Sequence, residues 1–326
     1  MLTRRALVRL AAAAPVLTVS RNAFAEGEVY PSRVITSVCM FAPGTGADIF
    51  VRFFAKKLQE LANQTVIVEN KVGMAGNIAT EYVAKSKPDG YTIFIAPASS
   101  ILVAGPFLYK KLAYDPIKDF TSVTSLAKLP FVLVVAPDTG ANSVADLVAR
   151  LKAKPDHGFF GSSTTTGLIA SELLKQQFGL NSTEVKYKSG LDALNDLIAH
   201  NIDFQFTDPV TVKERIADGR LKALMLTSAE PFAALPKIPS ARQAGVNNID
   251  MISWWSVHVP AGTPRPVVDK LTGWFNQIAR SDDVRKFLAN LGSDPLIGDA
   301  ALVDQMIAKE TKEWETYVKI AKIEPQ

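Results

Sequence analysis

The chain is poor in the residues that build disulfides and metal sites. Its 326 residues include one cysteine and three histidines. Cys39 alone cannot form a disulfide within the chain, and its apolar surroundings are typical of a core thiol. None of the histidines (157, 200 and 258) has metal-ligand spacing to another histidine or to the cysteine. The sequence therefore predicts no bound metal and calls for no cofactor.

Motifs of the common enzyme classes are also missing. No Gly-x-Ser-x-Gly nucleophile elbow occurs. Residues 73–76 read Gly-Met-Ala-Gly and lack the Lys-Ser/Thr of a phosphate-binding loop. No third glycine follows Gly44 and Gly46 at the distance of a dinucleotide-binding fingerprint. These absences favour a protein that is not an enzyme, with catalysis by dispersed residues as the remote alternative.

Excess charge is confined to the start of the chain. The whole sequence has 36 basic and 32 acidic residues. Residues 1–25 hold four arginines and no acid, so the remainder has 32 of each sign and no net charge. A chain balanced in this way gives no support to a nucleic-acid partner or to an anionic membrane surface.

Residues 1–25 have the three parts of a secretory signal. Three arginines begin it, residues 10–19 form an apolar run too short to span a bilayer, and Ala23-Phe24-Ala25 is a small-x-small cleavage site. We expect cleavage after Ala25 and a periplasmic location. The pair Arg4-Arg5 also fits twin-arginine export, with an ordinary basic start as the alternative.

Strand-like and helix-like patterns alternate along the rest of the chain, which predicts an α/β protein of parallel sheets covered by helices on both faces. The length allows two domains. The expected strands are 33–40, 65–69, 91–96, 131–136, 159–161, 184–187, 202–206 and 221–227. The expected helices are 48–61, 77–85, 144–154, 168–178, 191–200 and 210–217.

Small and polar residues follow four of these strands, at 43–48, 98–100, 162–167 and 207–208. Ligands of open α/β sheets bind beyond the carboxyl ends of strands. The turn at 43–48 also starts an amphipathic helix, and a helix N-terminus attracts anions such as carboxylates. If two of these turns belong to each of two lobes, the pairs face each other across a cleft.

Each candidate residue has a structural alternative. Thr45 and Asp48 have the spacing of a capping box, so Asp48 either closes the helix start or accepts a hydrogen bond from a ligand amine or hydroxyl. Asp208 precedes Pro209 and either caps the next helix or faces the cleft. The hydroxyls at 162–166 either cap a helix or donate to a carboxylate. Trp254 and Trp255 favour core packing over an aromatic ligand platform.

Several longer blocks carry a resemblance to a known family. Residues 68–78 read Val-Glu-Asn-Lys-Val-Gly-Met-Ala-Gly-Asn-Ile, and residues 88–92 read Pro-Asp-Gly-Tyr-Thr. Further blocks follow in the same order at 114–120, 185–188 and 260–264. Together they resemble the Bug (Bordetella uptake gene) family, the extracytoplasmic solute receptors of tripartite tricarboxylate transporters. The resemblance extends over essentially the whole chain after the signal.

The resemblance implies a type II periplasmic-binding-protein fold, with two Rossmann-like α/β lobes, two hinge crossings and a cleft between the lobes. Lobe 1 would comprise residues 26–126 and 250–326, and lobe 2 residues 127–249. Backbone amides of a glycine-rich loop in lobe 1 and of a loop in lobe 2 would hold a small carboxylate. The expected ligand-binding residues are Gly44, Thr45, Gly46, Ala47, Asp48, Ser99, Ser100, Ser162, Ser163, Thr164, Thr165, Thr166, Gly167 and Asp208.

The resemblance also implies the partners. A monomeric receptor would deliver its carboxylate to the membrane subunits of a tripartite transporter. Alternatively, it would report ligand to a membrane sensor kinase, because both tasks need ligand-driven closure. An enzyme acting on a small carboxylate is the remote alternative.

Overall fold

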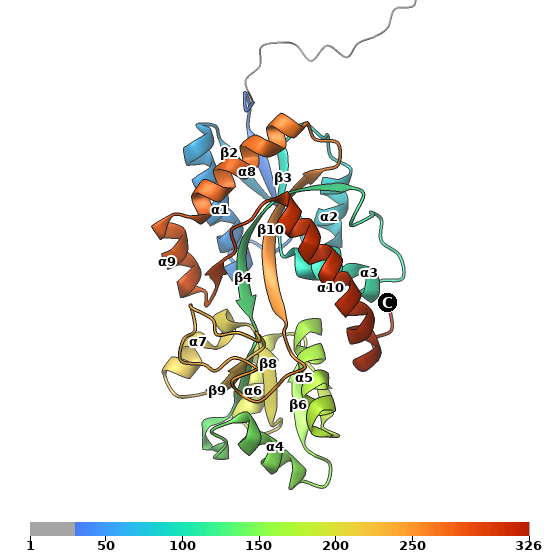
Figure 1. Cartoon of the computed structure of the whole chain (residues 1–326), viewed down its shortest axis with the longest axis vertical. Coiled ribbons are helices and arrows are strands. Elements are labelled where there is room, and N and C mark those ends of the chain that lie inside the picture. Colours follow the sequence, from blue (N-terminus) through green and yellow to red (C-terminus); the bar gives the residue numbers. More distant parts are fainter. Residues whose placement is uncertain (1–29, 326) are drawn as a thin grey trace, which may run out of the picture.

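The computed structural model describes residues 30–325 and shows two α/β units stacked along the long axis of the molecule (Figure 1). The predicted signal at 1–25 lies outside the described residues. Two strands, β4 (Phe120–Pro130) and β10 (Ile252–Pro260), run side by side toward the junction of the two units. Among the described residues, no helix is both long and apolar enough to cross a membrane.

The first unit is a six-stranded sheet in the order β11-β4-β10-β3-β1-β2. Its other strands are β1 (Ile35–Cys39), β2 (Val66–Asn70), β3 (Thr92–Ala96) and β11 (Asp294–Pro295). Its helices are α1 (Gly46–Ala62), α2 (Asn77–Ala84), α3 (Gly105–Leu108), α8 (Arg265–Ala279), α9 (Asp282–Asn290) and α10 (Ala300–Ile320), with the short turns η1 (Met74–Gly76) and η2 (Ser99–Val103).

The second unit is a five-stranded sheet in the order β7-β6-β8-β5-β9. Its strands are β5 (Val132–Val135), β6 (Phe159–Ser162), β7 (Thr183–Lys186), β8 (Phe204–Thr207) and β9 (Lys222–Leu226). Its helices are α4 (Val144–Lys152), α5 (Thr165–Phe178), α6 (Gly190–Ile198) and α7 (Pro209–Ala217), with the short turn η3 (Pro137–Thr139).

The expectation of parallel sheets is correct for only part of each unit. Strand β1 is parallel to β2 and β3, and β6 is parallel to β7 and β8. Strand β10 is antiparallel to β3 and β4, and β5 is antiparallel to β8 and β9. The antiparallel strand occupies the same place in both sheets, because in each case it is the strand that enters from the other unit.

Thr227 ties the two crossings together. The first crossing is Phe131, between β4 and β5, and the second runs from Thr227 to Met251. The Phe131 amide donates to Thr227 Oγ1 at 2.8 Å, and the Thr227 amide donates to the Phe131 carbonyl at 2.9 Å. Thr227 Oγ1 donates in turn to the Met251 carbonyl at 2.6 Å. Because Thr227 is fully buried, these bonds hold both crossings as one hinge.

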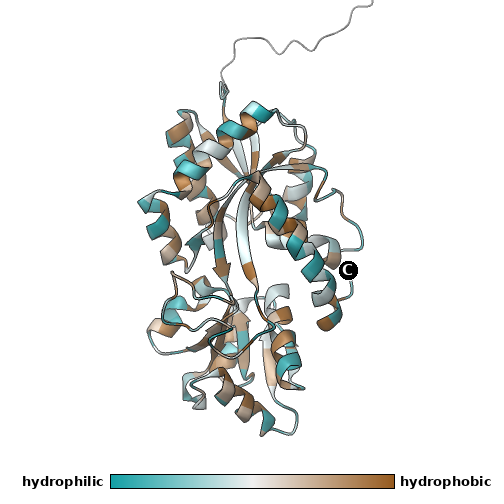
Figure 2. Ribbon diagram, viewed as in Figure 1, coloured by the Kyte–Doolittle hydropathy of each residue, from teal (hydrophilic) through white to brown (hydrophobic). Residues whose placement is uncertain are grey.

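The apolar core explains why the helices lie where they do. Apolar residues on α1 and α8 pack on one face of the first sheet, and those on α6 and α7 pack on one face of the second. A third cluster includes Phe94 and Leu102 of the first unit, Leu133 and Leu173 of the second, and Trp314 of α10. In Figure 2 the brown segments of the helices alternate with teal ones, as expected for helices with one buried face.

Candidate functional site

A cavity of about 470 Å³ lies where the two units meet. Its walls come from the ends of β1 and β4, the starts of β10, α1, α5 and α7, and single residues of other elements. The lining residues are Phe41, Gly46, Ala47, Phe50, Pro97, Ser100, Ala104, Leu108, Leu129, Phe131, Thr164, Thr165, Thr166, Asp208, Val210, Thr211, Ser253, Trp255, Leu291, Ser293 and Trp314. We refer to it as the interlobe cavity.

The first unit contributes the start of α1. Thr45 caps this helix, and its Oγ1 accepts the Asp48 amide at 3.2 Å. The preceding turn needs a left-handed residue at 44, where glycine has φ +81°. The next two residues, Gly46 and Ala47, line the cavity. Their amides belong to the first turn of the helix and have no acceptor within it.

Asp48 holds this turn from beneath and does not line the cavity. Its side chain is 2 % exposed, and it accepts hydrogen bonds from the Gly44 amide, Arg52 Nε and Asn70 Nδ2 at 2.7–2.8 Å. Burial acts to raise the pKa of Asp48, but the hydrogen bonds from Arg52, Asn70 and Gly44 outweigh it and lower the pKa to about 2. The capping reading of Thr45 is confirmed, with Asp48 reaching back to Gly44 and not to Thr45.

The second unit contributes the start of α5. Thr164 caps the helix, and its Oγ1 accepts the Gly167 amide at 3.1 Å. Thr165 and Thr166 line the cavity, and their amides belong to the first turn of α5. They correspond to Gly46 and Ala47, which line the cavity from the first turn of α1 in the other unit. Gly167 is needed for close packing, because a Cβ there would lie 2.7 Å from the Phe206 carbonyl oxygen. The helix start therefore lies directly against β8.

Asp208 caps α7 at the same cavity. Its carboxylate accepts the Thr211 amide at 2.9 Å and Thr211 Oγ1 at 2.6 Å. The cap predicted from the Asp-Pro pair is thus confirmed, and the side chain also lines the cavity. Next to it, Val210 approaches the other unit, since a Cβ on Gly46 would lie 3.9 Å from Val210 Cγ1.

Among residues 30–325, Asp208 is the only charged side chain on the cavity wall, and no lysine, arginine or histidine of that range lines it. A helix N-terminus carries a partial positive charge, and α1, α5 and α7 all begin at the cavity, α7 with its N-terminus capped by the Asp208 carboxylate. Two pairs of amides without helical acceptors and several hydroxyls are therefore the groups that would meet an anion.

Aromatic side chains form the apolar wall of the cavity. The Trp255 ring centroid lies 4.4 Å from that of Phe50 and 5.7 Å from that of Phe41. Trp254, the neighbouring residue, is fully buried and points into the core instead. Both tryptophans are buried in apolar clusters, as predicted, and Trp255 also lines the cavity. Side chains alternate between the two faces of β10, so Trp254 and Trp255 point to opposite sides of the strand.

The structure brings about half of the sequence-predicted residues to the cavity. Those on its wall are Gly46, Ala47, Ser100, Thr164, Thr165, Thr166 and Asp208. Gly44, Thr45, Asp48 and Gly167 support the helix starts from behind. Ser162 is buried and donates to Glu184, and neither it nor Ser163 lines the cavity.

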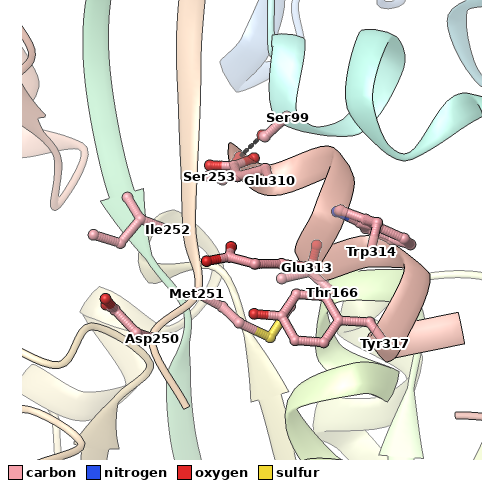
Figure 3. A pocket seen from close by; sticks show the side chains of 10 residues that line it. All are labelled: Ser99, Thr166, Asp250, Met251, Ile252, Ser253, Glu310, Glu313, Trp314 and Tyr317. Atoms are coloured by element: carbon pink, nitrogen blue, oxygen red, sulfur yellow. Dashed lines mark hydrogen bonds between the residues drawn. The ribbon is translucent and has the colours of Figure 1, made fainter. Parts of the chain in front are cut away.

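Ser99 lines a smaller cavity of about 40 Å³ behind the first one, together with Glu310, Glu313 and Tyr317 of α10 (Figure 3). We call it the rear chamber. Ser99 Oγ lies 3.3 Å from Ser253 Oγ, and it accepts the Trp254 amide at 3.3 Å. Of the two predicted serines, Ser100 lines the interlobe cavity and Ser99 lines the rear chamber. Among residues 30–325, no group of three or more His, Cys, Asp or Glu could hold a metal ion.

Two mixed α/β units, a double crossing and a cavity between them define a solute receptor of the periplasmic-binding-protein class. Residues 50–323 match the family model described as the tripartite tricarboxylate transporter family receptor. The chain belongs to this family, whose members are periplasmic solute receptors and not enzymes. The Bug resemblance found in the sequence is confirmed by the same match.

Relatives cover most of the chain. It is 31% identical over 312 residues to the UPF0065 protein in the tcbD-tcbE intergenic region of Pseudomonas sp. strain P51, covering 95% of this chain and 92% of that one. It is 28% identical over 306 residues to protein BugT of Bordetella pertussis, covering 93% and 94%.

Solved structures show the same fold. The R. palustris protein Rpa4515, solved with adipate, is 32% identical with a TM-score of 0.79, covering 91% of this chain and 100% of that one. MatC of Rhodopseudomonas palustris, solved with bound malate, is 26% identical with a TM-score of 0.73, covering 89% and 100%. The periplasmic binding protein BugD is 26% identical with a TM-score of 0.75, covering 91% and 100%.

Proposed function

We propose that the chain captures a small carboxylate in the interlobe cavity and delivers it to the membrane subunits of a tripartite tricarboxylate transporter. The observation that carries the ligand class is the pair of helix N-termini, α1 and α5, that open from opposite units onto a cavity lined by no cationic side chain of the described residues 30–325. Such amides suit an anion whose charge is spread over two oxygens. Adipate and malate, the molecules in two related structures, are of this kind.

The remaining proposals follow from the same role. The receptor is exported, cleaved after Ala25, and acts in the periplasm as a monomer. The lobes meet near 126–127 and 249–250, and the change of sheet at Phe131 and at 227–251 supports this division. Domain closure about the Thr227 hinge would bring the two helix starts together on the ligand.

A thermal-shift screen of the chain from Glu26 tests the ligand class. The panel comprises adipate, succinate, malate, citrate, benzoate and glutamate, with the matching amides and alcohols as controls. A ligand at one hundred times its Kd stabilises the folded state by about 2.7 kcal/mol. We expect a selective shift with one or more acids and none with the uncharged controls. A folded protein that no acid stabilises would contradict the proposal.

Asp208 makes a separate prediction about the body of the ligand. Because Asp208 faces the cavity and Asp48 does not, Asp208→Asn should change the preference for malate over succinate, and Asp48→Asn should not. A hydrogen bond from a ligand hydroxyl to a carboxylate is worth about 1.5–3 kcal/mol, so the ratio of the two Kd values should fall about tenfold in Asp208→Asn. Calorimetry on both variants measures it. An equal change for both acids would remove Asp208 from the ligand contacts.

A further inference from the structure

The rear chamber adjoins the proposed ligand site. Thr166, Ser253 and Trp314 line both cavities, so these three residues form the partition between them. Figure 3 shows the chamber from close by, with Glu310, Glu313, Trp314 and Tyr317 reaching in from α10 and Ser253 coming from β10. A charge in the chamber is therefore separated from the interlobe cavity by these shared side chains.

Glu310 is a carboxyl group with few stabilising contacts among the described residues. Among residues 30–325 it accepts one hydrogen bond, from Trp254 Nε1 at 2.6 Å. It forms no ion pair in that part of the chain. Trp254 lies on β10, the strand that returns from the second crossing. The hydrogen bond to Glu310 thus connects α10 to β10. Glu310 also shares the rear chamber with Thr166, in the first turn of α5.

The other charged groups around Glu310 do not neutralise it. Asp250 and Glu313 share the chamber; Glu313 pairs with Lys309 at 3.6 Å, and Asp250 accepts the Ala229 amide. Tyr317 is neutral, because burial and nearby carboxylates raise its pKa.

Cations on the neighbouring elements are engaged elsewhere. On β4 the Lys128 ammonium lies 5.6 Å over the Phe232 ring, and on α5 Lys175 pairs with Glu172 at 2.7 Å. In the part of the chain that the structure describes, no lysine, arginine or histidine lines the chamber. Burial raises the pKa of Glu310, and the hydrogen bond from Trp254 lowers it. Burial is the larger effect, and the pKa is raised to about 7.

We propose that Glu310 binds a proton together with the anionic ligand, so that the receptor takes up its carboxylate and a proton as a pair. The inference rests on the proposed function, because it requires an anion in the interlobe cavity. A ligand carboxylate on the other side of the Thr166–Ser253 partition would disfavour the ionised form of Glu310. The neutral form leaves Trp254 with its acceptor and places no second negative charge behind the ligand.

The direction of the effect follows from linkage. Glu310 titrates near pH 7 in the free protein and at higher pH in the complex, so binding takes up protons between the two values. The contribution of Glu310 to affinity is greatest and constant below about pH 6. It falls as pH rises through 7, by about tenfold for each unit by which the ligand raises the pKa of Glu310, and it levels off above the pKa of the complex.

Titration calorimetry measures this uptake directly. The probes are adipate, succinate and benzoate, whose own carboxyl groups titrate well below pH 7, and the tightest of the three is used. Binding at pH 7.5 is measured in HEPES and in Tris, because proton uptake makes the observed heat depend on the buffer. We expect uptake of a substantial fraction of one proton, and an affinity at pH 8.5 several-fold below that at pH 6.

Glu310→Gln keeps an acceptor for Trp254 Nε1 and removes the titration. The variant should show no uptake, and at pH 8.5 it should bind the probe as tightly as the wild type does at pH 6. Glu315→Gln is the matched control, since Glu315 lies on the exposed side of α10, and it should behave as wild type. Uptake that persists in Glu310→Gln, or buffer-independent heats in the wild type, would overturn the inference.

A readout without ligand separates this inference from the proposed function. The Trp254 indole donates to Glu310, so tryptophan emission of the free protein should change with a midpoint near pH 7, and this change should be lost in Glu310→Gln. Absence of that transition overturns the inference whether or not a ligand binds. Failure of all three probes to bind at pH 6, with the transition present, counts against the proposed function.

Discussion

Ala47→Glu is expected to weaken carboxylate binding at least a hundredfold while leaving the fold intact. Ala47 lies in the first turn of α1 and lines the interlobe cavity, so the new carboxylate would occupy the same amides as the ligand. Two like charges about 4 Å apart at a protein surface repel by about 4 kcal/mol, which is more than enough for this loss. An acid in the first turn of a helix is otherwise favourable, so the Tm should stay unchanged or rise slightly.

Ala301→Glu is the matched control. Ala301 holds the same position in α10 as Ala47 does in α1, two residues after the capping side chain, and it is exposed and away from the interlobe cavity. The control should bind as wild type in the same calorimetric titration. If Ala47→Glu bound a carboxylate within threefold of wild type, the start of α1 would not be part of the ligand site.

Asp48→Ala is expected to destabilise the folded state by about 2–3 kcal/mol. The change removes the acceptor of the Gly44 amide, Arg52 and Asn70 together. Breaking a buried ion pair costs about 3–5 kcal/mol, and the lower figure applies because the Arg52 side chain is 47 % exposed. Urea unfolding at pH 7 measures the loss. Affinity should fall with it, since the turn that presents Gly46 is no longer held.

Acid pH and a second aspartate separate this effect from ordinary capping. The pKa of Asp48 is lowered from 3.8 to about 2, so its contribution is present above pH 3.8 and lost as pH falls toward 2. The gap between wild type and Asp48→Ala should therefore close over that window. Asp146 has the same capping position in α4 but is exposed, and Asp146→Ala should cost about 1 kcal/mol or less. Equal losses at the two sites would show that the Arg52 and Asn70 contacts contribute nothing.

Local patterns predict much of this fold, and the elements that they miss have physical reasons. The elements expected between residues 33 and 96 and between 131 and 227 are all present within a few residues. No element was expected for β4, β10 or the three C-terminal helices. The spacing of Val303, Ile307 and Trp314 marks α10 as a helix with one buried face, a signal that the sequence does contain. That β10 returns between β3 and β4 depends on contacts more than a hundred residues apart, which local periodicity does not record.

The candidate site divides in a similar way. Helix capping depends on residues close in sequence, so Thr45 and Asp208 mark two of the helix starts at the cavity from the sequence alone. For the third start the sequence indicates only the hydroxyl run 162–166, in which Thr164 is the cap. Which residue of a polar run faces the cavity depends on packing: Ser100 lines the cavity and Ser99 does not. Asp48 points away from the cavity because Arg52 and Asn70 donate hydrogen bonds to its carboxylate there. The aromatic wall and Glu310 were not predicted, since they come from elements that only the assembled fold brings together.

The most direct test of the central claim is an amide NMR titration of the deuterated chain from Glu26 with the tightest acid of the screen. If the two helix starts bind the carboxylate, the largest downfield proton shifts will be those of the amides of Gly46, Ala47, Thr165 and Thr166, because these donors would bond to the ligand. Saturating ligand that leaves those four amides unmoved while shifting others would contradict the proposed site.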